Sequence, residues 1–330
     1  MPNWVFNSVN GYDKELYDKY KNSDTDIDFN KVIPEPEEIT NTISGSESII
    51  AKEIYDYKTW KETSDNNHKY NSPIYSSMKS KAENITKQIG ELSLENQNNS
   101  LVEILENENN KFFADRYDRY VDLFGNKAFK NLTDEEFDKG CEKYIANNEE
   151  RFSKYKEEDI NNKNSNKNDP LKNYNDTLYS YNSLYEYGKH SNDLLEKYGY
   201  DNWYDWRCAN WGTKWNACDS DYDENSDTLH FDTAWSIPEP IFAKITNDNP
   251  NKFLSIYSEE ESGWFEELEA NNGKITKVAY GDIIYDENTD ESTEKRTEIK
   301  ESDREYFSYE DIQKHYIDLQ NSFKNLYSNI

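Results

Sequence analysis

Tryptophan residues with charged and amide side chains between them are the chain's strongest candidate for a site that does chemistry. Six of the eight tryptophans fall between positions 203 and 264. Aromatic walls with a few polar groups are typical of pockets that bind small molecules. Such a pocket would draw on Arg207, Asn210, Trp211, Lys214, Trp215, Asp232 and Trp235.

The same tryptophans also have a structural interpretation. They can form a hydrophobic core, with Arg207 and Lys214 paired at its edge with Asp205 or Asp232. Aromatic residues make up 15% of the chain, whereas hydrophobic residues of all kinds reach only 34%. Each aromatic ring can bury roughly 150–250 Å². The aromatics are therefore the abundant core material, and the structural interpretation is favoured.

Three aspartates resemble the beginning of a calcium-binding loop. Asp219, Asp221 and Asp223 stand at alternate positions, as the first ligands of such a loop do. Glu224 stands where the loop needs glycine, and His230 stands where it needs glutamate. A solvated hairpin turn is the favoured interpretation of this segment.

The sequence contains no recognisable catalytic motif. Its four histidines and three cysteines lack C-x-x-C and H-x-x-x-H spacings. Cys208, Cys218 and His230 could hold a metal only if the fold brought them together. No dinucleotide-binding glycine motif, phosphate-binding loop or nucleophile elbow occurs. We therefore expect no catalytic residues, no metal and no cofactor.

The chain is strongly acidic, with 67 Asp and Glu against 38 Lys and Arg and a net charge of −29. Residues 201–330 hold 29 of the acidic residues and only 12 basic ones. Acidic runs are usually solvated faces, but they can also imitate nucleic-acid phosphates and occupy a basic groove. The candidate acidic surface comprises Asp219, Asp221, Asp223, Glu224, Glu259, Glu260, Glu261, Glu266 and Glu267, with a further run at Glu287–Glu294.

The composition and the N-terminal sequence restrict the classes of partner and the cellular compartment that we expect. Binding to phosphates needs clusters of Lys and Arg, and no dense basic run occurs, so we expect no direct nucleic-acid binding. No stretch approaches the ~20 apolar residues of a membrane span, and the N-terminus has no signal-peptide pattern. Three cysteines, an odd number, favour reduced thiols in a bacterial cytoplasm.

The elements that must position these residues fall into three stretches. Residues 2–10 alternate as a strand, with Trp4 and Phe6 opposite Val5, and Asp13 can cap a short helix. An acidic connector, 24–38, follows. Residues 46–198 have helical periodicity, including a capping box at Thr133–Glu136 and a last helix over 171–198.

After Gly199 the pattern changes to strands. We expect a helix end and a strand over 204–218, an acidic turn over 219–227 and a strand over 228–235. Ser236 is expected to cap a helix that ends near residue 249. Strands are expected at 253–257 and 275–285, and Ser308 is expected to cap a C-terminal helix.

Without the helical stretch, the order is strand–helix, strand–strand, helix–strand. This is the order of a ferredoxin-like antiparallel sheet. The sequence therefore predicts an α+β protein with a ferredoxin-like domain formed by residues 1–38 and 199–330. A large all-helical insertion spans 39–198, and a C-terminal helix follows the sheet.

Three segments resemble a known family. They are Met1–Trp4, the run GYDNWYDWRCANWGTKW over 199–215 and the run FDTAWSIPEP over 231–240. They resemble the YubB ferredoxin-like family, proteins of unknown function carried by bacteriophages and plasmids. The resemblance covers residues 1–20 and about 195–285. It implies the fold and a mobile-element origin, and it supplies no catalytic residues. The large insertion and the acidity depart from the family, so we expect any special role to lie outside the shared core.

Our leading hypothesis is a non-enzymatic counter-defence protein of a phage or other mobile element. An anti-CRISPR or anti-restriction protein would bind the basic surface of a host defence protein or nuclease complex, whose channels are lined with Lys and Arg. One alternative is a nucleotide-like ligand binder or an enzyme that uses the Trp203–Trp235 cluster. The other is an accessory or virion structural protein.

Overall fold

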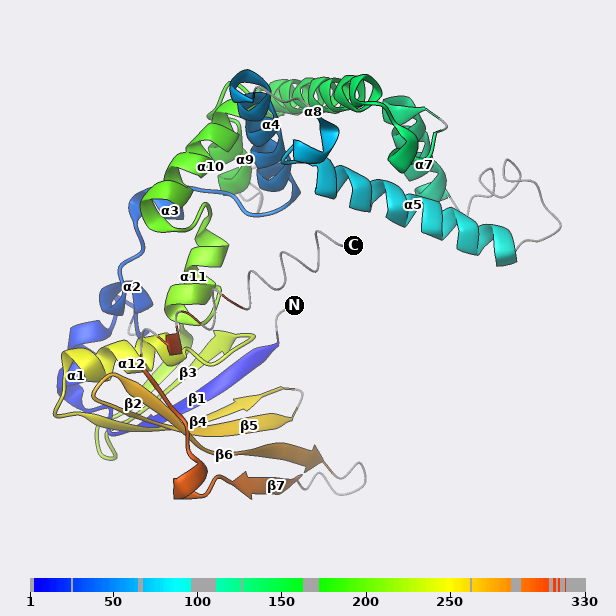
Figure 1. Cartoon of the computed structure of the whole chain (residues 1–330). Coiled ribbons are helices and arrows are strands. Elements are labelled where there is room, and N and C mark those ends of the chain that lie inside the picture. The colour runs from blue at the N-terminus through cyan, green and yellow to red at the C-terminus, as the bar shows by residue number, and fades with distance from the viewer. Residues whose placement is uncertain are drawn as a thin grey trace. The chain divides into compact units, whose positions relative to one another are not determined.

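In the computed structural model the chain divides into two compact units, which are described separately (Figure 1). The ferredoxin-like unit comprises residues 1–40 and 202–321, and the helical unit comprises 41–201 with 322–330. The division lies close to the expected boundaries after residues 38 and 198. The structure describes residues 3–24, 26–64, 68–95, 111–125, 127–162, 172–261, 263–285 and 292–308, and positions 311, 312, 314 and 318.

The ferredoxin-like unit contains an eight-stranded sheet in which all described pairs are antiparallel. The order is β2-β3-β1-β4-β5-β6-β7, and β8 pairs with the first part of β6. The strands are β1 (Trp4–Asn10), β2 (Cys218–Asp223), β3 (Thr228–Ala234), β4 (Phe253–Glu260), β5 (Trp264–Asn271), β6 (Lys274–Tyr285), β7 (Ser292–Glu298) and β8 (Tyr306–Ser308).

The first four strands confirm the expected ferredoxin-like topology. The order β2-β3-β1-β4, with helices between β1 and β2 and between β3 and β4, is that of the split βαβ fold. Strands β5 to β8 extend this core beyond β4. The expected acidic turn over 219–227 was wrong in part, because residues 218–223 form β2. Strand β5 was missed, because its acidic sequence WFEELEAN was interpreted as a solvated surface.

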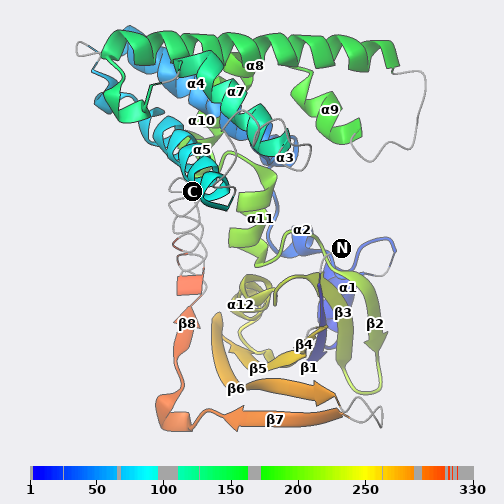
Figure 2. The same cartoon turned by 90° about the vertical axis from the view of Figure 1, so that its right-hand side faces the viewer.

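One face of the sheet is buried and the other is open. Val5 and Val9 are fully buried, whereas Phe6 is 42% exposed, as the expected alternation requires. Helices α1 (Lys14–Tyr20), α2 (Phe29–Val32) and α12 (Glu239–Asp248) cover the buried face (Figures 1 and 2). Asn7, also buried, donates to Thr233 Oγ1 at 3.0 Å, so the polar group on this face is satisfied.

The N-terminal caps of α1 and α12 can be compared with the expected ones, Asp13 and Ser236. Asp13 accepts from the backbone N–H of Leu16 at 3.1 Å, which confirms it as the cap of α1. Ser236 does not cap α12: Pro238 takes the cap position, without a side-chain hydrogen bond, and the Ser236 hydroxyl donates to the carbonyl of Gly212. Ser236 thus satisfies the end of the preceding helix, α11 (Trp203–Trp211).

The helical unit consists of six α-helices and two short 3₁₀ turns among its described residues. The capping box is confirmed, because Thr133 and Glu136 exchange hydrogen bonds of 2.9 and 3.2 Å. The expected single helix over 171–198 was wrong, because Ser183 caps a new helix there. The elements are α4 (Ser46–Thr63), η1 (Lys69–Asn71), α5 (Tyr75–Glu95), α7 (Lys111–Phe124), η3 (Phe129–Asn131), α8 (Asp134–Asn162), α9 (Lys172–Leu178) and α10 (Leu184–Tyr198).

The core of the helical unit is rich in aromatic residues. Tyr75, Phe129 and Phe137 contact one another with ring centroids 5.4–6.0 Å apart. Helices α4 and α10 pack closely where Gly188 lies against the backbone of Ala51. Aromatic rings bury large areas per residue, which explains how a chain with few aliphatic residues builds this core.

Some expectations lie outside the described residues. Ser308 accepts from the N–H of Asp311 at 3.2 Å, which is the expected start of a C-terminal helix, but most of that helix lies beyond the described positions. The acidic run 287–294 also lies largely outside them. Among the helices that the structure describes, none is long and apolar enough to cross a membrane.

Candidate functional site

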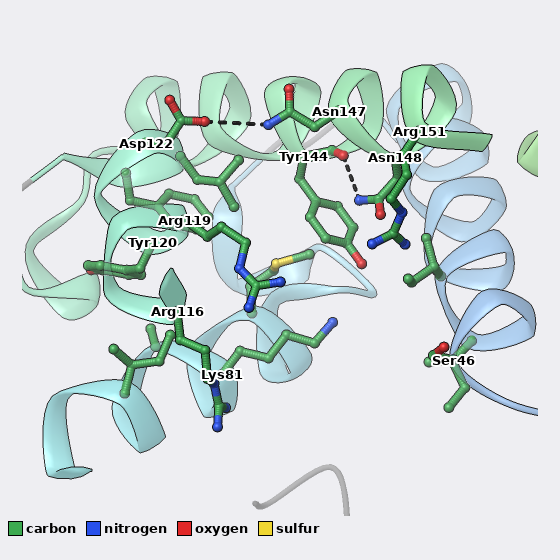
Figure 3. A pocket seen from close by; sticks show the side chains of 17 residues that line it. Ser46, Lys81, Arg116, Arg119, Tyr120, Asp122, Tyr144, Asn147, Asn148 and Arg151 are labelled. Atoms are coloured by element: carbon green, nitrogen blue, oxygen red, sulfur yellow. Dashed lines mark hydrogen bonds between the residues drawn. The ribbon is translucent and has the colours of Figure 1, made fainter. Parts of the chain in front are cut away.

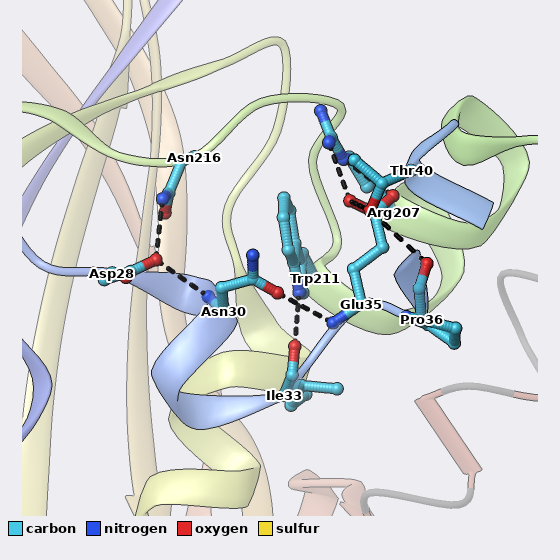
Figure 4. A network of polar contacts seen from close by, with 9 residues as sticks. All are labelled: Asp28, Asn30, Ile33, Glu35, Pro36, Thr40, Arg207, Trp211 and Asn216. Carbon is cyan, nitrogen blue, oxygen red and sulfur yellow. Dashed lines mark hydrogen bonds and ion pairs between the residues drawn. The ribbon is translucent and has the colours of Figure 1, made fainter. Parts of the chain in front are cut away.

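The residues of the candidate tryptophan pocket form two groups of contacts. The first group is centred on Arg207, whose guanidinium donates two hydrogen bonds, of 3.0 and 2.7 Å, to the carboxylate of Glu35 (Figure 4). The Glu35 side chain is fully buried. The guanidinium also lies 5.0 Å from the ring centroids of Trp203 and Trp211. A bidentate contact that is also stacked on aromatic rings leaves Arg207 engaged within the fold.

Neighbouring residues complete this network. Trp211 is buried and its indole N–H donates to the carbonyl of Ile33 at 3.0 Å, and the buried Asn210 donates to the carbonyl of Trp206 at 2.8 Å. The Thr40 hydroxyl donates to Glu35 at 2.9 Å. These contacts hold the connector between α2 and α3 (Glu37–Thr40) against α11 (Figure 4).

Glu35 is the site residue that the sequence interpretation missed. Asp205 and Asp232 were the expected partners of Arg207 and Lys214, whereas Arg207 forms its ion pair with Glu35. Glu35 lies between two prolines in a connector, 172 positions before Arg207. No periodicity or motif marks such a residue, because its role depends on a contact distant in sequence.

The second group is exposed and basic. The Lys214 ammonium lies 4.0 Å from the ring centroid of Trp215 and 5.3 Å from that of Trp235. Trp215 is 37% exposed, Trp235 is 51% exposed, and Trp4 contacts Trp215 with centroids 5.9 Å apart. The cation–π contacts of Lys214 are therefore with Trp215 and Trp235, and those of Arg207 are with Trp203 and Trp211.

The open face of the sheet brings acidic and aromatic residues together. Strand pairing places Asp232, Phe6 and Glu259 side by side on adjacent strands. The next row along the strands contains Asp221, His230, Ser8, Tyr257 and Glu267. Phe6 stacks on His230 with centroids 5.6 Å apart. We call this surface the open face, and its members are Phe6, Ser8, Asp221, His230, Asp232, Tyr257, Glu259 and Glu267.

Two expected surface residues lie on the other side of the sheet. Glu260 is only 4% exposed and pairs with the buried Val5. Glu266 lies on the same side and pairs with Lys277 at 2.5 Å. The reason is the two-residue period of a strand, which sends consecutive side chains to opposite faces. The expected acidic surface was therefore wrong for these two glutamates.

Other expected acids remain on the open side or at its edge. Asp219, Asp221, Asp223 and Glu224 are exposed on or beside the edge strand β2, and Glu261 is exposed after β4. Charged side chains on an edge strand also discourage pairing with other chains. Their exposure on an edge strand therefore has a structural explanation that requires no partner.

The open face has a negative field. Burial raises the pKa of Asp232, and the carboxylates of Asp219 and Glu261 raise it further. Glu267 is paired with Arg296. No described lysine or arginine lies within ion-pair distance of Asp221 or Asp232. Negative charge is thus left over on this face, interleaved with aromatic rings.

The described residues do not form a metal or thiolate site. No group of three or more His, Cys, Asp or Glu among them could hold a metal ion. Burial raises the pKa of Cys208 to about 11 and that of Cys218 to about 11. Both thiols therefore stay protonated at neutral pH and lack the thiolate that nucleophilic chemistry needs.

Comparison with known families adds one finding. Residues 210–303 match the family model described as a ferredoxin-like domain in Api92-like protein. The matched residues begin in α11 and include β2 to β7 and η4 (Glu301–Asp303), but not β1. Comparisons with curated proteins and with solved structures returned no match.

Proposed function

We propose that this chain is a non-enzymatic protein that binds the basic surface of a host nucleic-acid-handling protein through its open face. The observation that carries the proposal is the arrangement of Asp221, Asp232 and Glu259 beside Phe6 and Tyr257 on one sheet face, where Phe6 and Asp221 are exposed and the other three are half-buried. Such a surface is complementary to a groove lined with Lys and Arg.

Two interactions would act together at this surface. Carboxylates accept charge-assisted hydrogen bonds from guanidinium and ammonium groups. Aromatic rings next to them offer cation–π contacts to the same groups. A net charge of −29 would steer such a partner towards the chain and would repel nucleic acid itself.

The same proposal includes origin and setting. The family-model match supports a ferredoxin-like domain, and the resemblance of the sequence to the YubB family favours a phage or plasmid protein acting in the cytoplasm of a bacterial host. Mobile elements meet restriction and CRISPR effectors, whose nucleic-acid channels are basic. We therefore propose counter-defence, as an anti-CRISPR or anti-restriction inhibitor, as the biological role.

The proposal can be tested by capture from a bacterial host lysate on the immobilised full chain, followed by elution with double-stranded DNA. We expect DNA to displace the captured protein, because both ligands would occupy one basic groove. Raising the salt concentration from 50 to about 200 mM should weaken capture at least tenfold.

A pair of matched variants locates the surface. Asp221→Asn with Glu259→Gln should reduce capture at least tenfold. Glu301→Gln with Asp303→Asn removes the same charge from the exposed turn η4 and should leave capture unchanged. Equal capture by both variants, or capture that DNA and salt leave unaltered, would overturn the proposal.

A further inference from the structure

The helical unit contains a cavity of about 600 Å³ between α4, α5, α7 and α8 (Figure 3). This volume is within the range of pockets that bind small molecules. Three helices line it with residues at positions i, i+3, i+4 and i+7, which is the spacing of one helix face. The stripes are Met78, Lys81, Ala82 and Ile85 on α5, Arg116, Arg119, Tyr120 and Leu123 on α7, and Tyr144, Asn147, Asn148 and Arg151 on α8.

The lining concentrates positive charge in a very acidic chain. The sequence has six arginines, and three of them, Arg116, Arg119 and Arg151, line this cavity together with Lys81. Asp122 is the single acidic residue of the lining, and it pairs with Lys143 at 2.5 Å. The charge of the cavity is therefore opposite to that of the whole molecule.

Two of these cations, Arg119 and Arg151, are in no ion pair that the described residues form, although the Glu47 carboxylate lies near enough to Arg151 to interact with it electrostatically. The Lys81 ammonium is bound by the buried Glu53 at 2.9 Å. By contrast, no carboxylate among the residues that the structure describes lies within ion-pair distance of Arg119 or Arg151. Figure 3 shows these two arginines reaching into the pocket from α7 and α8. Their guanidinium groups can bind one anionic group bidentately.

The side of the cavity that α4 and α5 form is mainly aliphatic. Ile49, Ile50, Met78, Ala82 and Ile85 line the side formed by α4 and α5. Ile49 is 60% exposed, so solvent reaches this part of the lining. An aliphatic wall beside arginines suits an amphipathic anion. Tyr120, Phe124 and Tyr144 also line the cavity, so a nucleotide, whose base could stack on these rings, is the competing class of ligand.

We propose that this cavity binds a single-chain amphipathic anion, with its alkyl chain against the aliphatic wall and its carboxylate or phosphate on Arg119 and Arg151. This site is separate from the open face, so either can fail without the other. Burial of methylene groups supplies affinity, and the arginines select for charge.

Isothermal titration calorimetry of the full chain with decanoate, decyl phosphate, decanol and AMP tests this assignment. We expect one decanoate or one decyl phosphate per chain, and the tighter of the two identifies the head group. Decanol lacks the charge and AMP lacks the alkyl chain, so both should bind at least tenfold more weakly. Equal binding of decanol, tighter binding of AMP, many sites per chain or no binding by either alkyl anion would overturn it.

Variants test the two arginines. Arg119→Gln and Arg151→Gln should each weaken decanoate or decyl phosphate roughly tenfold to hundredfold, since each removes a charge-assisted hydrogen bond. Lys154→Gln makes the same charge change one turn beyond Arg151, where the side chain is 70% exposed, and should have no effect. All three residues are exposed, so circular dichroism should show an unchanged fold. Equal effects in the three variants would contradict the site.

Discussion

The two units of this protein differ in how far apart in the sequence their stabilising contacts lie. In the ferredoxin-like unit, Asn7 bonds Thr233 across 226 positions and Glu35 binds Arg207 across 172. The described residues of the helical unit all lie in the continuous stretch 41–201. The ferredoxin-like unit therefore depends on pairs that bridge the insertion, and the helical unit depends on the packing of consecutive helices. Long connections of this kind are tolerated because the entropic cost of closing a loop grows slowly with its length.

The units also differ in how they use their few arginines. In the ferredoxin-like unit, Arg207 binds Glu35 and Arg296 binds Glu267, and carboxylates remain in excess on the open face. In the helical unit, Arg119 and Arg151 face a cavity. One acidic chain thus presents surfaces of opposite sign, and each is a separate hypothesis about binding.

The largest loss of stability is expected when the ion pair between Glu35 and Arg207, which bridges the insertion, is broken. Arg207→Met leaves the Glu35 carboxylate buried without its partner, which should cost about 3–5 kcal/mol. Hydrogen-exchange mass spectrometry should show faster exchange in the sheet, with the helical unit unaltered. If helices α4 to α10 lose as much protection from hydrogen exchange as the sheet does, the stability of the two units does not depend on separate sets of contacts.

A second substitution sharpens this test. Adding Glu35→Leu to Arg207→Met removes the stranded charge and should recover most of the lost stability. Lys244→Met is the control, since its pair with Asp248 lies on the surface of α12 and should contribute under about 1 kcal/mol. A loss in the control as large as in Arg207→Met would show that the buried pair is not special.

The converse test perturbs the helical unit alone. In Gly188→Ala the new Cβ would lie 2.1 Å from the carbonyl oxygen of Ala51, so α4 and α10 must separate at a cost of about 1–3 kcal/mol. Lys189→Ala, at the next position of α10, is the control, because this side chain is exposed and the substitution adds no atom to the contact with α4. Exchange should rise in α4 and α10 and stay unchanged in β1 to β4. An undisturbed α4–α10 pair would contradict the close packing.

The smallest effect is a pH dependence confined to the ferredoxin-like unit. Burial, together with the Glu266 carboxylate and against the opposing effect of Lys277, raises the pKa of Glu239 to about 7. The unfolded pKa is about 4.3, so the folded state holds the proton more tightly and stability falls as the pH rises from about 4 to 7. Glu239→Gln should therefore stabilise the unit at pH 8, by on the order of 1–2 kcal/mol, and have little effect at pH 4.

Urea unfolding at the two pH values measures this difference. Glu301→Gln, at an exposed position of the same unit, is the control and should change neither value. A Glu239→Gln variant that is equally stabilised at pH 4 and pH 8 would show that the effect is not one of ionisation.

Much of the fold followed from local patterns in the sequence. The alternation around Val5, the cap at Asp13 and the capping box at Thr133 all have the expected form. Errors arose where two local patterns competed. The acidic strands β2 and β5 have the alternation of strands, but their charge made them resemble solvated turns. Ser183 and Ser236 are both serines that precede a helix, but only Ser183 caps one, because the Ser236 hydroxyl donates to the carbonyl of Gly212.

Much less of the candidate site than of the fold could be predicted from the sequence. The residue types of the open face were visible, but which of two consecutive glutamates faced solvent was not, because strand β5 had not been identified. The arginine-lined cavity was missed altogether. Its i, i+3, i+4, i+7 stripes are visible on each helix, yet a stripe that contains arginine is equally typical of a solvated face.

The sequence by itself determined the acidic balance, the helical stretch and the ferredoxin-like order of strands and helices, because these depend on composition and on neighbouring residues. Only the tertiary structure decided that Glu35 would meet Arg207, that Glu259 and Glu260 would point to opposite faces, and that three arginines would share one cavity. Those outcomes depend on which distant segments come together. Residues far apart in sequence carry no local pattern that identifies their partners.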